Sequence, residues 1–410
     1  MHRLAVAGLI SVLFTAVAGA QPPPSLITEA EFLSALDEAH PAVLARQRQV
    51  ADAQADIVAA STLANPQLGF VREDPSGPVR QLDVLLSWEL PRPSRGPEIH
   101  AAERGADVAE AQLAEEVLEL RLTMRRIYAE WAVATARSER LAAQVSHVDD
   151  LADRERSRAE KGETSGLEAH QLTLAAAGLR ARLALTEAEV VASRAAARVW
   201  RSDIDDDALP VLPQLPTATA PIGVHPREEA ALAELDAASL ASKAAGRYVL
   251  LPELLGGWQR QEVGPESLEG PVLGLAWAVP VFARNQAQRA QTDARALAAA
   301  AELEMTRREV EAQRTGALAA YRHLSEAASA AAESVGANER MLAGAVAAFG
   351  HGEADVTDLL TMLSLAFSSD MTALDLHEVA LAAHRELERV TGHALEISQS
   401  TPPTSQGAMP

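Results

Sequence analysis

The feature of this sequence that most constrains its fold is a set of short sequence motifs that occurs twice, in the same order. The second copy follows the first by 185 to 190 residues. Each half is therefore expected to build one unit: a short helix, two strands, a very long helix, a tight turn and a return helix. Such a unit is far longer than a solenoid repeat, so two copies predict a pseudo-symmetric protomer of a ring-shaped assembly. The recurring motifs are His40-Pro41 and His225-Pro226, Trp88–Pro91 and Trp277–Pro280, Arg95 and Arg284, and Gly162-Glu163 and Gly352-Glu353.

The first twenty residues have the pattern of a secretory signal peptide. Arg3 supplies the positive charge, Leu4–Val17 the apolar stretch and Ala18–Ala20 the small-residue cleavage site. The apolar stretch is short for a helix that spans a bilayer. We expect no later segment to qualify as a membrane-spanning helix either. The mature chain, from residue 21, is therefore expected to be exported, with any membrane span made of strands.

Composition excludes several classes of protein. The sequence contains no cysteine, which rules out disulfides, thiolate metal sites and lipid attachment through an N-terminal cysteine. A formal charge of −21 argues against nucleic acid as a partner. Aromatic residues make up only 3% of the chain, whereas Ala, Leu, Glu and Arg dominate, as in long helices and coiled coils. We expect a mainly α-helical, elongated fold with a small β part.

The first unit is expected to cover residues 21–201. A helix is predicted over 29–63, with an interruption at Pro41. Strands are predicted at about 67–73 and 80–90, joined by a Pro- and Gly-containing turn. A helical hairpin follows over 94–201, and its tip lies at 161–166. The outgoing helix is proline-free after Pro97 and would be roughly 100 Å long at 1.5 Å per residue.

The second unit is expected to cover residues 225–392, after a proline-rich linker at 202–224. Its predicted parts are a helix over 226–246, strands at about 254–261 and 272–279, and a helical hairpin over 283–392 with its tip at 350–355. The remaining residues, 393–410, are rich in Ser, Thr and Pro. We predict that this tail is disordered.

The strands alternate in a way that fits a membrane barrel. Leu82, Val84, Leu86 and Trp88 share one face of the second strand. A soluble sandwich is the alternative, but two short hairpins do not make a stable sandwich alone. A closed barrel shared among several chains removes the open edges. Trp88 and Trp277 would then form an aromatic girdle on the lipid face.

Taken in order, these features resemble the TolC-like outer-membrane efflux proteins over about residues 29–392. The short length and the run Pro91–Glu98 look most similar to the CzcC-like cation-efflux branch. The residues that carry the resemblance are Asn65–Leu68, Trp88–Pro91, Arg95-Gly96, Val279–Phe282 and Gly352–Leu359.

The resemblance implies a homotrimer in the outer membrane of a Gram-negative bacterium. Four strands from each protomer would form a twelve-stranded barrel, continued by a periplasmic α-barrel. A periplasmic adaptor and an inner-membrane pump, of the RND type, would complete a passive efflux duct. The resemblance implies no covalent chemistry and no cofactor.

It also implies that the two helix turns form the tip that meets the adaptor. Glycine permits a tight reversal, and an exposed apolar side chain gives a partner something to contact. Judged on the residues alone, a plain helical hairpin without a partner is the simpler interpretation. The candidate tip residues are Arg158, Gly162, Thr164, Ser165, Leu167, Phe349, Gly352, Asp355 and Val356.

Asp358 aligns with the family position whose carboxylates line the narrow end of the pore. A ring of carboxylates favours cations. Thr361 occupies the position of a second acid, so we expect a weaker or differently built gate. Glu168, 190 residues before Asp358, is the candidate from the first half. The alternative is that Asp358 is a solvated acid favoured by the helix dipole.

Two other functional classes were weighed. A periplasmic coiled-coil adaptor would carry one hairpin and more strands, and a secreted hydrolase would need a catalytic constellation that the sequence lacks. His377 and His384 are seven residues apart, about 10 Å along a helix, which is too far for one metal ion without a third element. We expect no metal site there, and a surface or pore-lining position for both histidines.

Overall fold

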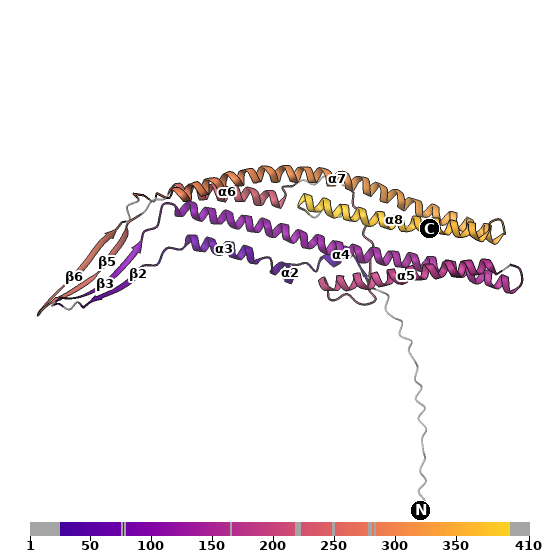
Figure 1. The fold of residues 1–410 in the computed structure, drawn as a ribbon, viewed down its shortest axis with the longest axis horizontal. Helices are drawn as coiled ribbons and strands as arrows, with labels where there is room; N and C mark the ends of the chain where they lie inside the picture. Colours follow the sequence, from indigo (N-terminus) through magenta and orange to yellow (C-terminus); the bar gives the residue numbers. More distant parts are fainter. Residues whose placement is uncertain are drawn as a thin grey trace, which may run out of the picture.

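The computed structural model describes residues 25–74, 77, 79–164, 166–217, 223–247, 251–277, 281–282 and 284–393. The expected signal peptide and the expected tail beyond His393 lie outside the described residues. The protein is long and narrow, with a small sheet at one end and helices extending from it (Figure 1).

The sheet has four antiparallel strands in the order β2-β3-β5-β6. They are β2 (Gln67–Glu73), β3 (Val79–Glu89), β5 (Glu253–Val263) and β6 (Glu266–Ala276). The halves of the chain join where β3 pairs with β5 from Val79 to Glu89. The fourth strand was predicted at 272–279 but begins at Glu266 and contains Pro271. Proline lacks a backbone donor and is tolerated here because β6 is an edge strand.

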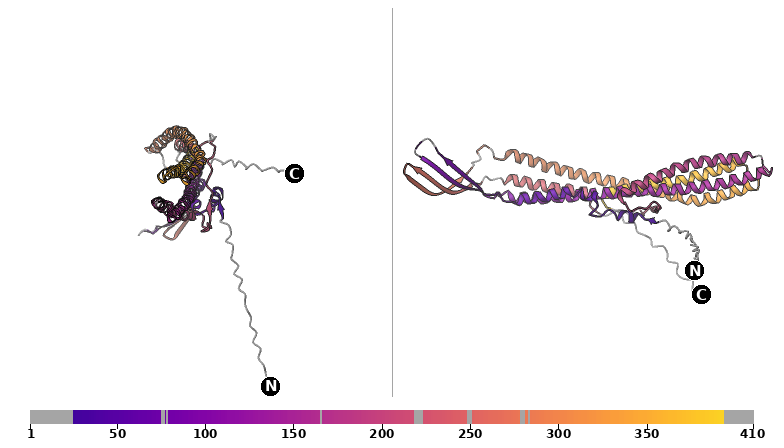
Figure 2. Two further views of the ribbon diagram at one scale, coloured as in Figure 1. Left: turned by 90° about the vertical axis from the view of Figure 1, so that its right-hand side faces the viewer. Right: turned by 90° about the horizontal axis from the view of Figure 1, so that it is seen from below.

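Most of the helical part consists of five long helices: α4 (Arg95–Glu160), α5 (Leu167–Trp200), α6 (Pro226–Gly246), α7 (Gln286–Gly350) and α8 (Val356–Thr391). Helix α4 has 66 residues, which corresponds to about 100 Å. Helices α4 and α7 run the length of the helical part, whereas α6 and α8 follow one another alongside them (Figure 1). Seen end on, the helices form an arc with one concave side (Figure 2).

The helix predicted over 29–63 is instead three short helices. They are α1 (Glu29–Leu33), α2 (Pro41–Leu44) and α3 (Arg48–Ser61). His40 begins α2 as its N-cap, because its Nδ1 accepts a hydrogen bond from the backbone N–H of Ala42 at 3.2 Å. Pro41 takes the first helical position, where its missing N–H has no partner to lose. The His-Pro pair therefore begins a helix and does not merely kink one.

The second His-Pro pair does the same for α6. Nδ1 of His225 accepts from the N–H of Arg227 at 3.0 Å, and Nε2 lies 3.0 Å from the carbonyl oxygen of Arg389. Nε2 must therefore carry the proton and donate it. Burial lowers the pKa of His225, which favours this neutral form. The cap thus ties the start of α6 to the end of α8.

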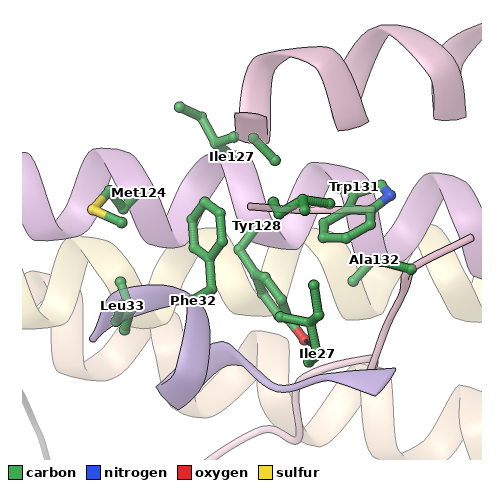
Figure 3. Packing of buried hydrophobic residues seen from close by; sticks show 11 residues of the cluster. Ile27, Phe32, Leu33, Met124, Ile127, Tyr128, Trp131 and Ala132 are labelled. Carbon is green, nitrogen blue, oxygen red and sulfur yellow. Dashed lines mark hydrogen bonds between the residues drawn. The ribbon is translucent and has the colours of Figure 1, made fainter. Parts of the chain in front are cut away.

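Residues 202–217, within the linker predicted at 202–224, pack against the helices. β1 (Leu26–Ile27) pairs in parallel with β4 (Leu209–Pro210). The Tyr128 hydroxyl lies 2.8 Å from the carbonyl oxygen of Ile27 and 2.7 Å from that of Val211. Tyr128 is fully buried beside Phe32 and Trp131 in the core at mid-length (Figure 3).

Two more side chains hold the linker across the second half. Nε2 of His377 in α8 donates to the carbonyl oxygen of Pro213 at 2.8 Å. The hydroxyl of Tyr321 in α7 donates to the carbonyl oxygen of Pro216. Because prolines cannot donate, the segment depends on donors from the helices that it crosses. The linker therefore connects α4, α7 and α8 near the middle of the molecule.

A buried charge cluster lies under this linker. Arg125 of α4 is 5% exposed, and its Nε lies 3.1 Å from Oε1 of Glu29. The same guanidinium donates to Glu388 of α8, which is completely buried. His384 lies one turn before Glu388, and burial lowers its pKa to about 4. One arginine thus joins the N-terminal segment, the first half and the second half.

The composition of helix α8 differs from what the sequence analysis predicted. By length and composition alone it is apolar enough to cross a membrane, whereas no segment after the leader was expected to be. Neighbours within the chain cover only part of this apolar stretch: α8 packs along α7 and contacts α4, yet only 22% of the stretch is buried. Leu359 and Leu363 on its buried face are less than 3% exposed.

The buried charge cluster predicts that substituting two adjacent arginines, Arg125 and Arg126, will reduce the free energy of unfolding by very different amounts. Replacing Arg125 by Met leaves Glu388 as an uncompensated buried charge and should cost about 3–5 kcal/mol of unfolding free energy. Arg126→Met removes only an exposed pair with Glu130 and should cost less than about 1 kcal/mol. Urea unfolding of the purified variants measures both. Equal losses would show that the cluster is not the strong link described.

His384 predicts a pH dependence. Its pKa is about 4 in the folded chain, below the ordinary 6.5, so between these values the unfolded chain binds a proton that the folded chain does not. The stability that depends on neutral His384 is therefore complete above pH 6.5, and the free energy of unfolding decreases as the pH falls toward 4. His384→Gln should flatten the unfolding free energy across this range. An identical slope in both proteins would contradict the assignment.

Candidate channel surfaces

One face of the sheet is apolar across all four strands. The register places Leu68 beside Leu86, Leu86 beside Gly256, and Gly256 beside Leu273. Because side chains alternate along a strand, every second residue from these positions shares the face. Its large side chains are open to solvent in the single chain: Leu273 is 87% exposed, Phe70 69% and Trp258 49%. A surface of this kind requires an apolar environment or a partner.

On the two middle strands, β3 and β5, the opposite face is mostly polar. Gln81 pairs with Gln261, and Asp83 with Gln259. Nε2 of Gln81 donates to Oδ2 of Asp83 at 2.7 Å along the strand. An apolar face and a polar face on strands of seven to eleven residues match the two sides of a membrane β-barrel wall.

The sheet is open at both edges. Among the described residues, β2 pairs only with β3, and β6 only with β5. Each edge therefore presents backbone N–H and C=O groups without a strand partner. In an apolar environment these groups must be paired by another strand.

Trp88 and Trp277 are placed at the same end of the sheet, near the helices. Trp88 pairs with Leu254, which pairs with Leu275, two residues before Trp277. The alternation therefore puts both indoles on the apolar face. Trp277 is 61% exposed. The Nε1 of Trp88 donates to the carbonyl oxygen of Ala64 at 3.0 Å, which fixes this ring against the loop before β2.

At the other end of the molecule, two helix turns form the tip. Gly162 and Gly352 have φ of 77° and 72°, in the left-handed region that suits glycine. The N–H of Glu163 bonds to the carbonyl of Arg158 at 3.0 Å, and that of Glu353 to Ala348 at 2.9 Å. Each bond closes a Schellman motif. The recurring Gly-Glu pair is thus a helix-ending signal.

The tip has an apolar core that joins both halves. Phe349 is 6% and Val356 5% exposed, and both pack with Leu151, Leu172 and Leu359. These two candidate contact residues are therefore buried in the chain and shape the tip from within. Among the candidate tip residues, Leu167 offers an apolar side chain to a partner, because it is 61% exposed.

The remaining tip candidates are polar. Arg158 bonds to Glu155 at 2.9 Å and lies 3.6 Å from Glu163. Thr164 is half-buried, and Ser165 lies outside the described residues. The carboxylate of Asp355 caps α8 by accepting from the N–H of Asp358 at 2.8 Å.

The candidate gate residues lie just inside the helix starts. Asp358 and Thr361 are exposed, and Thr361 Oγ1 donates to the carbonyl oxygen of Thr357 at 2.7 Å. Glu168 is half-buried. Because the first turn, 161–166, is one residue longer than the second, 351–355, Glu168 is the second residue of α5 while Asp358 is the third of α8. The two acids therefore differ by about 100° around their helices.

The histidines of α8 serve packing. His384 is 5% exposed, and its ring lies 5.1 Å from that of Tyr321, so the expected surface or pore-lining position was wrong for this residue. His377 is half-buried and bonded to the linker. Within the described residues, no group of three or more His, Asp or Glu side chains is arranged to hold a metal ion.

Solved structures with the same architecture decide what kind of fold this is. Vibrio cholerae VceC, an outer membrane protein, matches with a TM-score of 0.72 and 16% identity, over 90% of this chain and 97% of that one. The Campylobacter jejuni CmeC outer membrane channel matches with a TM-score of 0.70 and 13% identity, over 97% and 95%. CusC, described as forming a transmembrane channel, matches at 0.72 and 16%, over 89% and 92%. The fold is that of an outer-membrane channel. No family model and no curated protein matches the sequence.

Within this channel fold, sequence reasoning missed part of the apolar face. It named the tryptophans that precede the two prolines but not Trp258 or Phe70, which share a row with Val84. The alternation of apolar residues along β2 and β5 could have placed both side chains on this face, although the two glycines at Gly256-Gly257 weaken the pattern in β5.

The left-handed conformation of Gly162 predicts that replacing it and Gly344 by alanine will change the stability of the protein in opposite directions. Gly162→Ala should destabilise the protein by about 1–2 kcal/mol, because a Cβ is unfavourable in the left-handed region. Gly344→Ala, at an exposed position inside α7, should stabilise it by about 0.5–1 kcal/mol. Neither site has atoms within 4 Å that a Cβ would meet, so backbone conformation alone distinguishes them. Thermal unfolding tests the sign, and shifts in the same direction would refute the turn assignment.

Proposed function

We propose that this protein is the outer-membrane channel of a tripartite efflux system in a Gram-negative bacterium. The observation that carries the proposal is the sheet, which is apolar on one face, polar on the other and open at both edges. The channel fold shared with VceC, CmeC and CusC supports it. The chain would act as a passive duct and not as an enzyme.

The duct would be a homotrimer. Pairing β2 of one copy with β6 of the next would give each edge a partner strand and yield twelve strands. The arc of helices would continue as a periplasmic α-barrel, with its concave side to the pore (Figure 2). Exposed apolar side chains on α5 and α7, such as Leu185 at 69% and Leu297 at 74%, would then meet the neighbouring copy. The two halves of the chain would act as tandem units within each protomer.

The tip is proposed to meet a periplasmic adaptor, which connects the duct to an inner-membrane pump of the RND type. Leu167 offers the apolar contact, and Arg158, Gly162 and Gly352 shape the surface around it. A duct of this kind takes its specificity from the pump. A charge of −21 favours cations over anions as cargo, and heavy-metal cations, as in the CzcC-like branch, are the narrower form of the proposal.

The decisive experiment is extraction from the outer membrane. The protein should require detergent, migrate as a trimer in unheated samples and convert to a monomer on heating. Recovery of a folded monomer in the soluble periplasmic fraction would instead favour the adaptor alternative and reject the channel.

The gate proposal predicts a change in ion selectivity. Asp358→Ala should raise single-channel conductance or reduce the preference for cations in planar bilayers, because three carboxylates leave the narrow end of the pore. Glu353→Ala, an exposed acid in the adjacent turn, is the control and should change neither. Currents of unchanged size and selectivity in Asp358→Ala would reject the gate role.

A further inference from the structure

Gly256 leaves a hollow in the apolar face of the sheet. The hollow has a volume of about 660 Å³. Its walls are Leu86 and Trp88 of β3 and Leu273 and Leu275 of β6. It therefore lies across three neighbouring strands, on the face that the proposed function turns toward lipid.

Packing does not require a glycine at this position. A Cβ added to Gly256 would meet only Cδ2 of Leu273, at an ordinary 3.9 Å. At the next residue the situation is reversed, because a Cβ on Gly257 would collide with the carbonyl oxygen of Val84. Glycine weakens a strand and often marks a place where a ligand approaches the backbone closely. Gly257 is thus required for packing within the sheet. Gly256 is not, and its missing side chain leaves room for a ligand.

Closure of the barrel does not fill the hollow. A neighbouring copy would pair with the edges β2 and β6, and the outer face of β3 and β5 would remain uncovered. The occupant must also be apolar, since leucines and an indole form the walls. In a membrane barrel, that environment consists of lipid acyl chains.

The end of the hollow nearest the helices adds a polar feature. Trp88 and Leu275 lie close to the ends of β3 and β6. Along the chain, Arg92 follows β3, with its guanidinium 3.9 Å from Glu89 and its side chain 52% exposed. Phe282, which is 90% exposed, and Arg284, also exposed, follow β6. Exposed aromatic rings occur at the boundary between lipid and water, and guanidinium groups bind phosphate. An apolar hollow whose bounding strands lead into such residues has the chemistry that a phospholipid needs.

We propose that the hollow over Gly256 binds one acyl chain of a phospholipid, with its phosphate near Arg92 and Arg284 and Phe282 beside its headgroup. The site rests on the proposed function as a membrane channel and deepens it by naming a bound lipid. One lipid for each protomer is expected.

Native mass spectrometry of the detergent-extracted trimer tests the site. Wild-type trimers should retain phospholipid adducts, and Gly256→Leu, which fills the hollow, should lower their number at least several-fold. Val84→Leu adds bulk to the same face in the adjacent row and should retain the wild-type number. Equal adducts in all three proteins, or adducts of detergent alone, would overturn the proposal.

A second measurement separates this proposal from the proposed function. The chain has no cysteine, so Leu273→Cys carries a single spin label on the lipid face. Collisions with oxygen place the label in lipid, and collisions with an aqueous nickel complex place it in water. A label in water rejects the membrane channel itself. A label in lipid, with equal adducts in wild type and Gly256→Leu, rejects only the lipid site.

If Gly256→Leu does not assemble, the double variant Arg92→Gln/Arg284→Gln replaces it, because both positions lie outside the strands. It should lower phospholipid retention several-fold while trimers still form. Unchanged retention in this variant would overturn the proposal.

Discussion

The unpaired backbone at the two edges of the sheet is the constraint on which the rest of this structure depends. β2 and β6 each have one pairing partner within the described chain, and their outer face is apolar. Edge groups in an apolar environment lose their hydrogen bonds with water and must find another strand. A ring of copies meets this requirement, and the arc of helices supplies the curvature that such a ring needs.

Contacts within each helix pair differ from those between the pairs. Apolar side chains dominate where α4 meets α5 and where α7 meets α8, whereas several contacts across the boundary are ion pairs. Arg389 lies 3.0 Å from Glu119, and Arg137 lies 2.6 Å from Asp375. Exposed pairs contribute little and weaken with salt. Where α4 meets α8, the buried Arg125 cluster and the tip core are therefore firmer connections than these exposed pairs.

Local sequence signals predicted what depends on local chemistry. The spacing of apolar residues predicted the long helices, and the alternation from Leu82 to Trp88 predicted the face of β3. These local signals did not predict features that depend on segments distant in the sequence. Pro271 sits in a strand because β6 lies at an edge, and Phe349 is buried because helices from both halves converge on it. The linker itself was predicted, but its packing could not be, since its carbonyl groups bind Tyr128, Tyr321 and His377.

The one-residue difference between the two turns at the tip has a consequence for symmetry. Two similar helical hairpins in each of three chains would approach six equal positions around the pore. The longer first turn rotates Glu168 away from the orientation of Asp358, so two kinds of position would alternate around the end of the proposed duct. A molecule that docks there would encounter three-fold order, and copies that bind every hairpin would need two distinct modes of attachment.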